Sequence, residues 1–210
     1  MHDDLALRTV TAIVRGTERP NRRYAKTAAW IEEKYGVAVI TILDAPTRDL
    51  RRLAVWVRTA AEATRFRERG LMQQHVQDEV ANFILAHERR RIFARPQKPF
   101  IIVSAFEASI LNNKTALIGF EGHREIERLI DDPALAEVVV FGQWIIFFVH
   151  TDAQKVSHLE RSKAWHKIVF DYFARDDEFG VVTPDVFTFT LDSKETLNRD
   201  FEGSTYYYLK

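Results

Sequence analysis

The sequence contains no cysteine. This absence excludes disulfides, thiolate metal sites and a cysteine nucleophile. Long apolar runs are also missing, because the longest uncharged apolar stretch covers only residues 138–149, and a membrane-spanning helix needs about 20 residues. The first ten residues begin with acidic side chains and hold no apolar run, so they do not read as a secretory signal. We therefore expect a soluble, cytoplasmic protein without a membrane association.

Short catalytic signatures are lacking as well. The chain has no phosphate-binding loop of the G-x-x-x-x-G-K-[ST] or G-x-G-x-x-G type and no G-x-S-x-G nucleophile elbow. Two His/acid pairs have the four-residue spacing that places two ligands on one helix face, His75 with Glu79 and His123 with Glu127. Neither pair has an evident third ligand, so we expect no metal and no cofactor.

The apolar content is high enough for a sizeable core. Apolar residues make up 46% of the 210 residues and aromatic residues 12%, which excludes a disordered chain. Helical periodicity dominates the first half, whereas β-branched and aromatic runs dominate the second. This order predicts an α+β fold or a mixed α/β sheet, with a helical N-terminal half that holds one strand, followed by a mixed β-sheet flanked by helices.

Several individual elements follow from the local patterns. Residues 37–43 are apolar and β-branched, which predicts a buried strand. Gly142 in the apolar stretch predicts a tight hairpin, both arms of which lie at the centre of the sheet. The further expected elements are a helix capped by Thr47 with an inward face from Leu50 to Ala61, a helix over 72–92, a strand over 115–120, one long helix over 152–174, and strands over 186–191 and 205–209.

The strongest break in the pattern is the segment 95–99, which contains two prolines and reads as a connector. It predicts a mainly helical, Arg-rich segment over 1–94 and a sheet-rich α+β segment over 99–210, packed together as one compact domain. No internal repeat is apparent in the sequence.

Charge is distributed unevenly although the formal net charge is zero. Residues 1–100 hold 19 Lys and Arg, 16 of them Arg, against 12 Asp and Glu, whereas residues 101–210 hold 11 against 18. Such a split is typical of a nucleic-acid-binding face, of two halves that pack against each other, or of subunits that meet head to tail. The leading hypothesis is a non-enzymatic binding protein that acts through a protein partner or through self-association as a homo-oligomer.

A first alternative is a nucleic-acid-binding protein that uses the Arg-rich half, because clustered arginines neutralise phosphates. The candidate residues are Arg51, Arg52, Arg58, Arg89, Arg90, Arg91 and Arg95. The sequence neighbours of these arginines include few aromatic residues, which a single-strand interface uses for stacking.

A second alternative is a small-molecule enzyme with an acid–base site. Ligands of open α/β sheets bind beyond the C-terminal ends of the strands. The polar residues that follow expected strands are Asp44, Ser104, Glu107, His150 and Asp152. If these strands are parallel and adjacent, then Asp44, Glu107, His150 and Asp152 share one rim and suit general acid–base catalysis.

Overall fold

The computed structural model describes residues 2–45, 50–87 and 97–210. The fold is α+β, as predicted, with mixed sheets flanked by helices. The chain divides into two compact units, unit 1 (Met1–Ile110) and unit 2 (Leu111–Lys210). The boundary between the units falls within helix α5 (Phe106–Ala116). Residues 95 and 96 of the expected connector lie outside the described residues.

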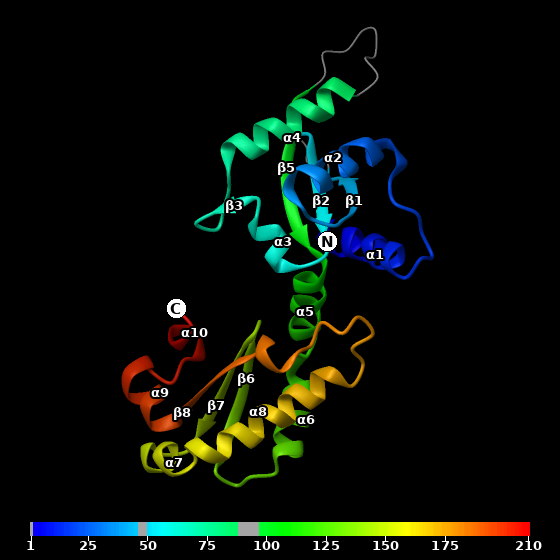
Figure 1. Ribbon diagram of the computed structural model, residues 1–210. Helices are drawn as coiled ribbons and strands as arrows, with labels where there is room; N and C mark the ends of the chain where they lie inside the picture. The colour runs from blue at the N-terminus through cyan, green and yellow to red at the C-terminus, as the bar shows by residue number, and fades with distance from the viewer. Residues whose placement is uncertain (1, 46–49, 88–96) are drawn as a thin grey trace. The chain divides into compact units, whose positions relative to one another are not determined.

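Unit 1 is built on a three-stranded sheet in the order β1-β2-β5, in which β2 pairs antiparallel with β1 and parallel with β5. Figure 1 shows these strands side by side, with helices packed around them. The elements before α5 are α1 (His2–Val14), η1 (Arg22–Tyr24), α2 (Ala25–Tyr35), β1 (Val39–Asp44), β2 (Arg52–Val57), α3 (Ala60–Thr64), β3 (Arg67–Glu68), β4 (Leu71–Met72), α4 (Gln74–His87) and β5 (Phe100–Ala105).

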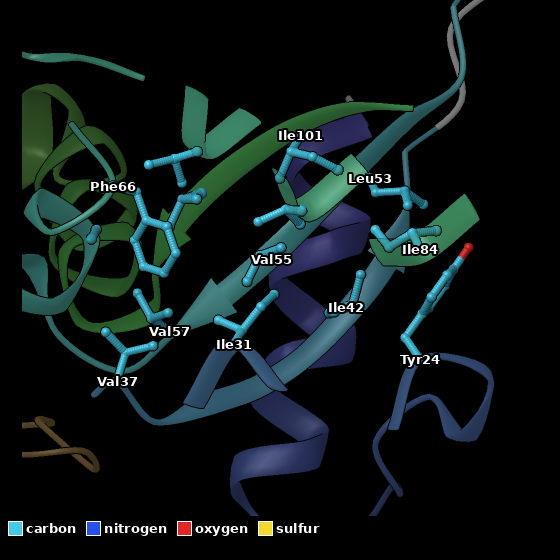
Figure 2. Close-up of a cluster of buried hydrophobic side chains, with 14 of the residues drawn as sticks. Tyr24, Ile31, Val37, Ile42, Leu53, Val55, Val57, Phe66, Ile84 and Ile101 are labelled. Atoms are coloured by element: carbon cyan, nitrogen blue, oxygen red, sulfur yellow. The ribbon is translucent and has the colours of Figure 1, made fainter. Parts of the chain in front are cut away.

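The core of unit 1 lies between this sheet and the helices α2 and α4. Alternate residues of β2, Leu53, Val55 and Val57, are fully buried and point towards Ile31 of α2 and Ile84 of α4, as Figure 2 shows. The side chains that alternate along β2 thus pack against the apolar faces of α2 and α4. The two helices contact each other as well as the sheet.

A buried amide joins α4 to the outer edge of β5. The Gln77 side chain donates from Nε2 to the Pro99 carbonyl (3.1 Å), and its Oε1 accepts from the Ile101 N–H (3.0 Å). These bonds replace the ladder that a further strand would make, so the edge of the sheet is blocked against strand addition at this point.

Unit 2 has a second three-stranded sheet in the order β6-β7-β8, with β7 antiparallel to β6 and parallel to β8. Its elements are α6 (Gly119–Ile130), β6 (Leu135–Phe141), β7 (Trp144–Val149), α7 (Asp152–Ser157), α8 (Leu159–Ala174), η2 (Pro184–Val186), β8 (Thr188–Ser193), α9 (Lys194–Phe201) and α10 (Thr205–Tyr208).

Strand β7 is apolar on both faces because helices cover both faces of the sheet. Phe147 is fully buried, and its ring lies edge-on to Trp165 of α8 at 5.6 Å between centroids. Phe148 lies on the opposite face, where its ring centroid is 5.3 Å from that of Tyr208 of α10. It belongs to the same buried apolar cluster as Leu197 of α9.

The two units share one topology. Each contains a helix, an antiparallel hairpin, two helices, a strand parallel to the second hairpin strand and a further helix, from α2 to α5 in unit 1 and from α6 to α9 in unit 2. Unit 1 adds the short β3-β4 pair between α3 and α4, and unit 2 adds η2 before β8. Both hairpins carry a register shift at the same place, directly after the pairs Val39↔Val57 and Leu135↔Val149. The chain therefore contains a structural repeat that its sequence does not reveal.

Local details of the repeat agree as well. The first helix of each repeat, α2 or α6, ends on a left-handed residue, Gly36 (φ 64°) or Asp131 (φ 45°). A glutamate one turn earlier accepts from a backbone N–H of the following strand: Glu32 does so in unit 1 and Glu127 in unit 2. The helix after each hairpin starts with a capping box.

Several expected elements are corrected by the structure. The predicted helix from Leu50 to Ala61 is instead strand β2 followed by the short α3, with Thr59 as its cap. The run from Leu53 to Val57 is buried throughout, and a continuous apolar run fits a buried strand as well as a helix. The proposed cap Thr47 lies outside the described residues.

The second half holds four further corrections. Residues 115–120 end α5 and begin α6 instead of forming a strand, and 205–209 contain the helix α10, which Ser204 caps. The long helix over 152–174 breaks at His158 into α7 and α8. The hairpin at Gly142 (φ 59°) is confirmed, but only its second arm is central, because β6 is an edge strand.

Candidate functional site

The four residues of the predicted acid–base rim do not share a sheet edge. Asp44 and Glu107 belong to unit 1, whereas His150 and Asp152 belong to unit 2. Within unit 1, Asp44 pairs opposite Leu53 at the beginning of β2, but Glu107 follows β5 beyond the other end of β2. The antiparallel direction of β1 thus places Asp44 and Glu107 at opposite ends of the sheet.

Asp152 of α7 connects this helix to α9 by hydrogen bonds. Its Oδ1 accepts from the Ser193 and Thr196 hydroxyls, and its Oδ2 accepts from the Arg199 guanidinium (2.9 Å). These hydrogen bonds, the one from Ser193 above all, hold the pKa of Asp152 well below its usual range. His150 precedes this cluster and is exposed. A carboxylate that already accepts three side-chain hydrogen bonds is a poor general base, so the geometry indicates a structural role for Asp152.

A neighbouring carboxylate, Asp192 at the end of β8, has the same character. It accepts from Lys155 Nζ, from the Tyr208 hydroxyl and from the Ser193 N–H, each at 2.8 Å. Burial alone would raise the pKa of Asp192, but the bonds from Lys155 and Tyr208 outweigh it, and this pKa is lowered. Asp192 therefore ties α7 and α10 to the sheet.

The two His/acid pairs are used for other contacts. Glu79 accepts from Lys34 Nζ (2.7 Å) and the Tyr35 hydroxyl (2.8 Å). His123 Nε2 accepts from a backbone N–H of β6, as Glu127 does. Over the described ranges, no group of three or more His, Asp and Glu side chains is arranged to hold a metal ion.

The candidate arginines do not lie together. Arg58 is exposed after β2 and forms an ion pair with Glu107 (3.7 Å). Arg51 and Arg52 lie at the opposite end of β2, at its start. The remaining candidates, Arg89, Arg90, Arg91 and Arg95, lie outside the described residues.

Arg51 and Arg52 are accompanied by basic residues from a distant part of the sequence. The Arg51 guanidinium lies 3.5 Å from the hydroxyl of Tyr24, the last residue of η1, and Tyr24 donates to Asp44 (2.8 Å). Arg23 pairs with the same carboxylate at 3.8 Å. We call Arg22, Arg23, Lys26, Arg51 and Arg52 the basic end of unit 1.

Tyr24 fixes the two parts of the basic end to each other. Its ring is buried in the core, and burial together with the hydrogen bond to Asp44 raises the pKa of Tyr24 to about 12. The hydroxyl thus remains a neutral donor at neutral pH. Asp44, which we expected in catalysis, is held between Tyr24 and Arg23.

The basic end includes an exposed aromatic ring. Phe100, the first residue of β5, pairs with Arg52 across the sheet and is 48% exposed. The Arg52 guanidinium lies 6.0 Å from the centre of this ring, within the range of a cation–π contact.

Three further rings stack along the contact between α2 and α4. Trp30 and Phe83 are 4.3 Å apart between centroids with an interplanar angle of 12°, and Phe83 and His87 are 4.1 Å apart at 24°. We call Trp30, Phe83 and His87 the aromatic column. It provides the stacked aromatic rings that the sequence neighbours of the arginines lack. Its rings come from segments more than fifty positions apart, and only the tertiary structure shows that they stack.

The chain matches no protein-family model, and comparisons with curated proteins and with solved structures find no match either. Among the helices that the structure describes, none combines the length and the apolar character needed to cross a membrane.

Proposed function

We propose that the protein binds nucleic acid through the basic end of unit 1. The supporting observation is that cations from two segments, η1–α2 and the start of β2, gather around one buried tyrosine. Arg22, Arg23 and Lys26 are exposed, and Arg51 and Arg52 are half-buried. Several fixed cations within one surface neutralise several phosphates at once, which is the main source of nucleic-acid affinity.

The charge of the whole unit supports the same function. Residues 1–110 hold 19 Lys and Arg against 13 Asp and Glu, a formal charge of +6, whereas residues 111–210 hold 11 against 17, a charge of −6. The units therefore differ in the sign of their field, and a polyanion is attracted to unit 1 alone. Asp44, the carboxylate within the basic end, is already bonded to Tyr24 and paired with Arg23.

The test is fluorescence anisotropy with a labelled 20-nucleotide single strand over a salt series. Each phosphate contact contributes about 0.7 to the slope of log affinity against log salt for a single strand. The double variant Arg22→Ala/Lys26→Ala is expected to weaken binding and to reduce this slope by about 1.4 if both side chains contact phosphates.

The matched control removes two exposed cations of unit 2, Lys163 and Lys167, which pair with acids on their own helix. Lys163→Ala/Lys167→Ala is expected to leave both affinity and slope unchanged. Absence of binding by the wild type at micromolar protein in low salt would refute the proposal. Light scattering that shows salt-sensitive self-association instead, abolished by the unit 1 variant, would assign the basic end to contact with a protein.

A further inference from the structure

We infer that the aromatic column stacks an unpaired base on His87 and thereby makes the protein selective for single strands; this inference rests on the proposed nucleic-acid function. The column is ordered as a stack, with successive ring centres 4.3 and 4.1 Å apart and interplanar angles of 12° and 24°. Trp30 and Phe83 are partly buried between α2 and α4, whereas His87 at the end of the series is exposed.

The ring of His87 is held in position by its own helix. Its Nδ1 lies 2.9 Å from the Phe83 carbonyl oxygen. A carbonyl only accepts, so Nδ1 carries the proton in this contact. The stacking on Phe83 and this bond together fix the plane of the imidazole. A ring fixed before binding loses little conformational entropy when a base stacks on it.

The direction of the helices places His87 towards the basic end. Helices α2 and α4 run antiparallel, because Tyr35 bonds to Glu79 while Trp30, earlier on α2, stacks on Phe83, later on α4. His87 follows one turn after Phe83 in the direction of the start of α2.

The core shows the same arrangement. Ile84 of α4 and Tyr24 of η1 belong to one buried cluster and lie next to each other in Figure 2. His87 is three residues beyond Ile84. Lys26, on α2, is four residues before Trp30, so it lies on the same helix face one turn closer to η1. A base on His87 would bring its phosphates towards Lys26 and Arg22.

This arrangement distinguishes a single strand from a duplex. Phosphates are present in both forms, so the basic end by itself binds either. Bases inside a duplex are already paired and stacked, whereas those of a single strand are available to aromatic rings. Stacking also tolerates any sequence, because every base has a π-face. The chemistry of the site therefore fits an unpaired nucleotide without a defined sequence.

The deciding variant is His87→Ala, assayed by anisotropy over the same salt series with a single strand, its duplex and an abasic strand of the same length. Loss of one stacked base is expected to weaken single-strand binding by roughly 5- to 150-fold, without change in duplex binding or in the salt slope. The wild type is expected to bind the abasic strand as weakly as His87→Ala binds the normal one. His87→Phe keeps an aromatic face and is expected to retain the preference.

The matched control is His75→Ala, which removes another exposed histidine of the same helix and is expected to change nothing. Equal effects of His87→Ala on single strand and duplex, or no effect on either, would overturn the stacking inference while leaving nucleic-acid binding in place. If the wild type binds neither form, then the proposed function itself fails, and the two failures are thus distinguishable.

Discussion

Unit 1 and unit 2 have the same strand order, the same hairpin register and the same capping boxes, but they differ in what fills equivalent positions. The register pairs Val57 of β2 with Ala105, and Val149 of β7 with Ser193. These pairs align Val57 with Val149 and Ala105 with Ser193. On this alignment, the hydrogen-bonded residues Asp152, Ser193 and Thr196 of unit 2 correspond to Ala60, Ala105 and Ala108 of unit 1. The topology therefore does not depend on the polar cluster.

The hydrogen-bonded cluster around Asp152 holds α9 against α7 in unit 2, whereas the corresponding helix of unit 1 has no such cluster among the described residues. In unit 2, α9 follows β8, contacts α7 and shares the core cluster of one sheet face with α10. Ser193 caps α9 while it donates to Asp152 of α7, and Glu195 of α9 accepts from the Asp152 N–H (2.7 Å). In unit 1 the corresponding helix is α5, which instead continues into unit 2.

The contact between the first and third helices of the repeat, α2 with α4 and α6 with α8, also differs. In unit 1 it holds the stacked rings of the aromatic column. In unit 2 it holds an ion pair between Arg175 and Glu125 (3.2 Å), with the guanidinium 5.6 Å from the centre of the Tyr172 ring. The same framework thus holds stacked rings in the unit with the positive net charge and a salt bridge in the unit with the negative net charge.

The largest expected effect tests whether the units unfold separately. Phe147→Ala removes a fully buried ring from the core of unit 2 and is expected to cost about 3–5 kcal/mol of unfolding free energy. Val55→Ala, at the corresponding position of unit 1, is expected to cost about 2 kcal/mol. Hydrogen exchange with mass spectrometry reads the peptides of each unit separately. Loss of protection confined to the mutated unit is the expected result, whereas equal loss in both would show that α5 couples them into one cooperative block.

A smaller effect is expected from Asp152→Ala, which gives unit 2 the residue that unit 1 carries at this position. The variant loses the carboxylate that accepts from Ser193, Thr196 and Arg199. Because the folded-state pKa of Asp152 is lowered, its contribution is complete above the unfolded pKa of about 3.9 and is lost as the pH falls through the folded pKa. The deficit of the variant is therefore expected at pH 7 and pH 5, and it should shrink below about pH 4.

Urea unfolding over this pH range measures the deficit. The reverse change, Ala60→Asp, is the control, because its neighbours in unit 1 are alanines that donate no side-chain hydrogen bond. It is expected to change the unfolding free energy by less than about 0.5 kcal/mol. A deficit of Asp152→Ala that persists undiminished to the lowest pH would contradict the role assigned to the carboxylate.

The sequence predicted the elements whose signal is local. The hairpin at Gly142 and the strand over 37–43 follow from a turn glycine and from a short β-branched run, and the structure contains both. Strand β2 was missed because a continuous apolar run does not separate helix from strand by its period. The repeat was missed for a related reason: it is carried by strand pairing and helix ends, which tolerate different side chains at equivalent positions.

The candidate site shows the same limit. The sequence identified Arg51 and Arg52, but their companions Arg22, Arg23 and Lys26 come from a segment some thirty residues earlier. Similarly, the arrangement of Asp44 and Glu107 depended on the direction of β1, which no local pattern encodes. Pairwise proximity across a sheet or between helices is a tertiary property, and it decides which polar residues meet.

The smallest expected effect compares the two capping boxes, the closest local match between the units. Thr59 accepts from the Glu62 N–H in unit 1, and Thr151 accepts from the Gln154 N–H in unit 2. Thr59→Ala and Thr151→Ala are each expected to cost about 1 kcal/mol, the usual value of an N-cap threonine. Hydrogen exchange in peptides that cover α3 and α7 measures the two costs side by side.

The boxes differ in one chemical respect, which gives them different responses to acid. Burial alone would raise the pKa of Glu62, but bonds from the Ala38 and Thr59 N–H groups outweigh it, so the pKa is lowered. The contribution of Glu62 is therefore present above its unfolded pKa of about 4.3 and is lost as the pH falls through its lower folded pKa, whereas Gln154 does not titrate. Protection of α3 should decline in this range and protection of α7 should not. Parallel decline of both helices would show that acid acts on the units as a whole and not on this carboxylate.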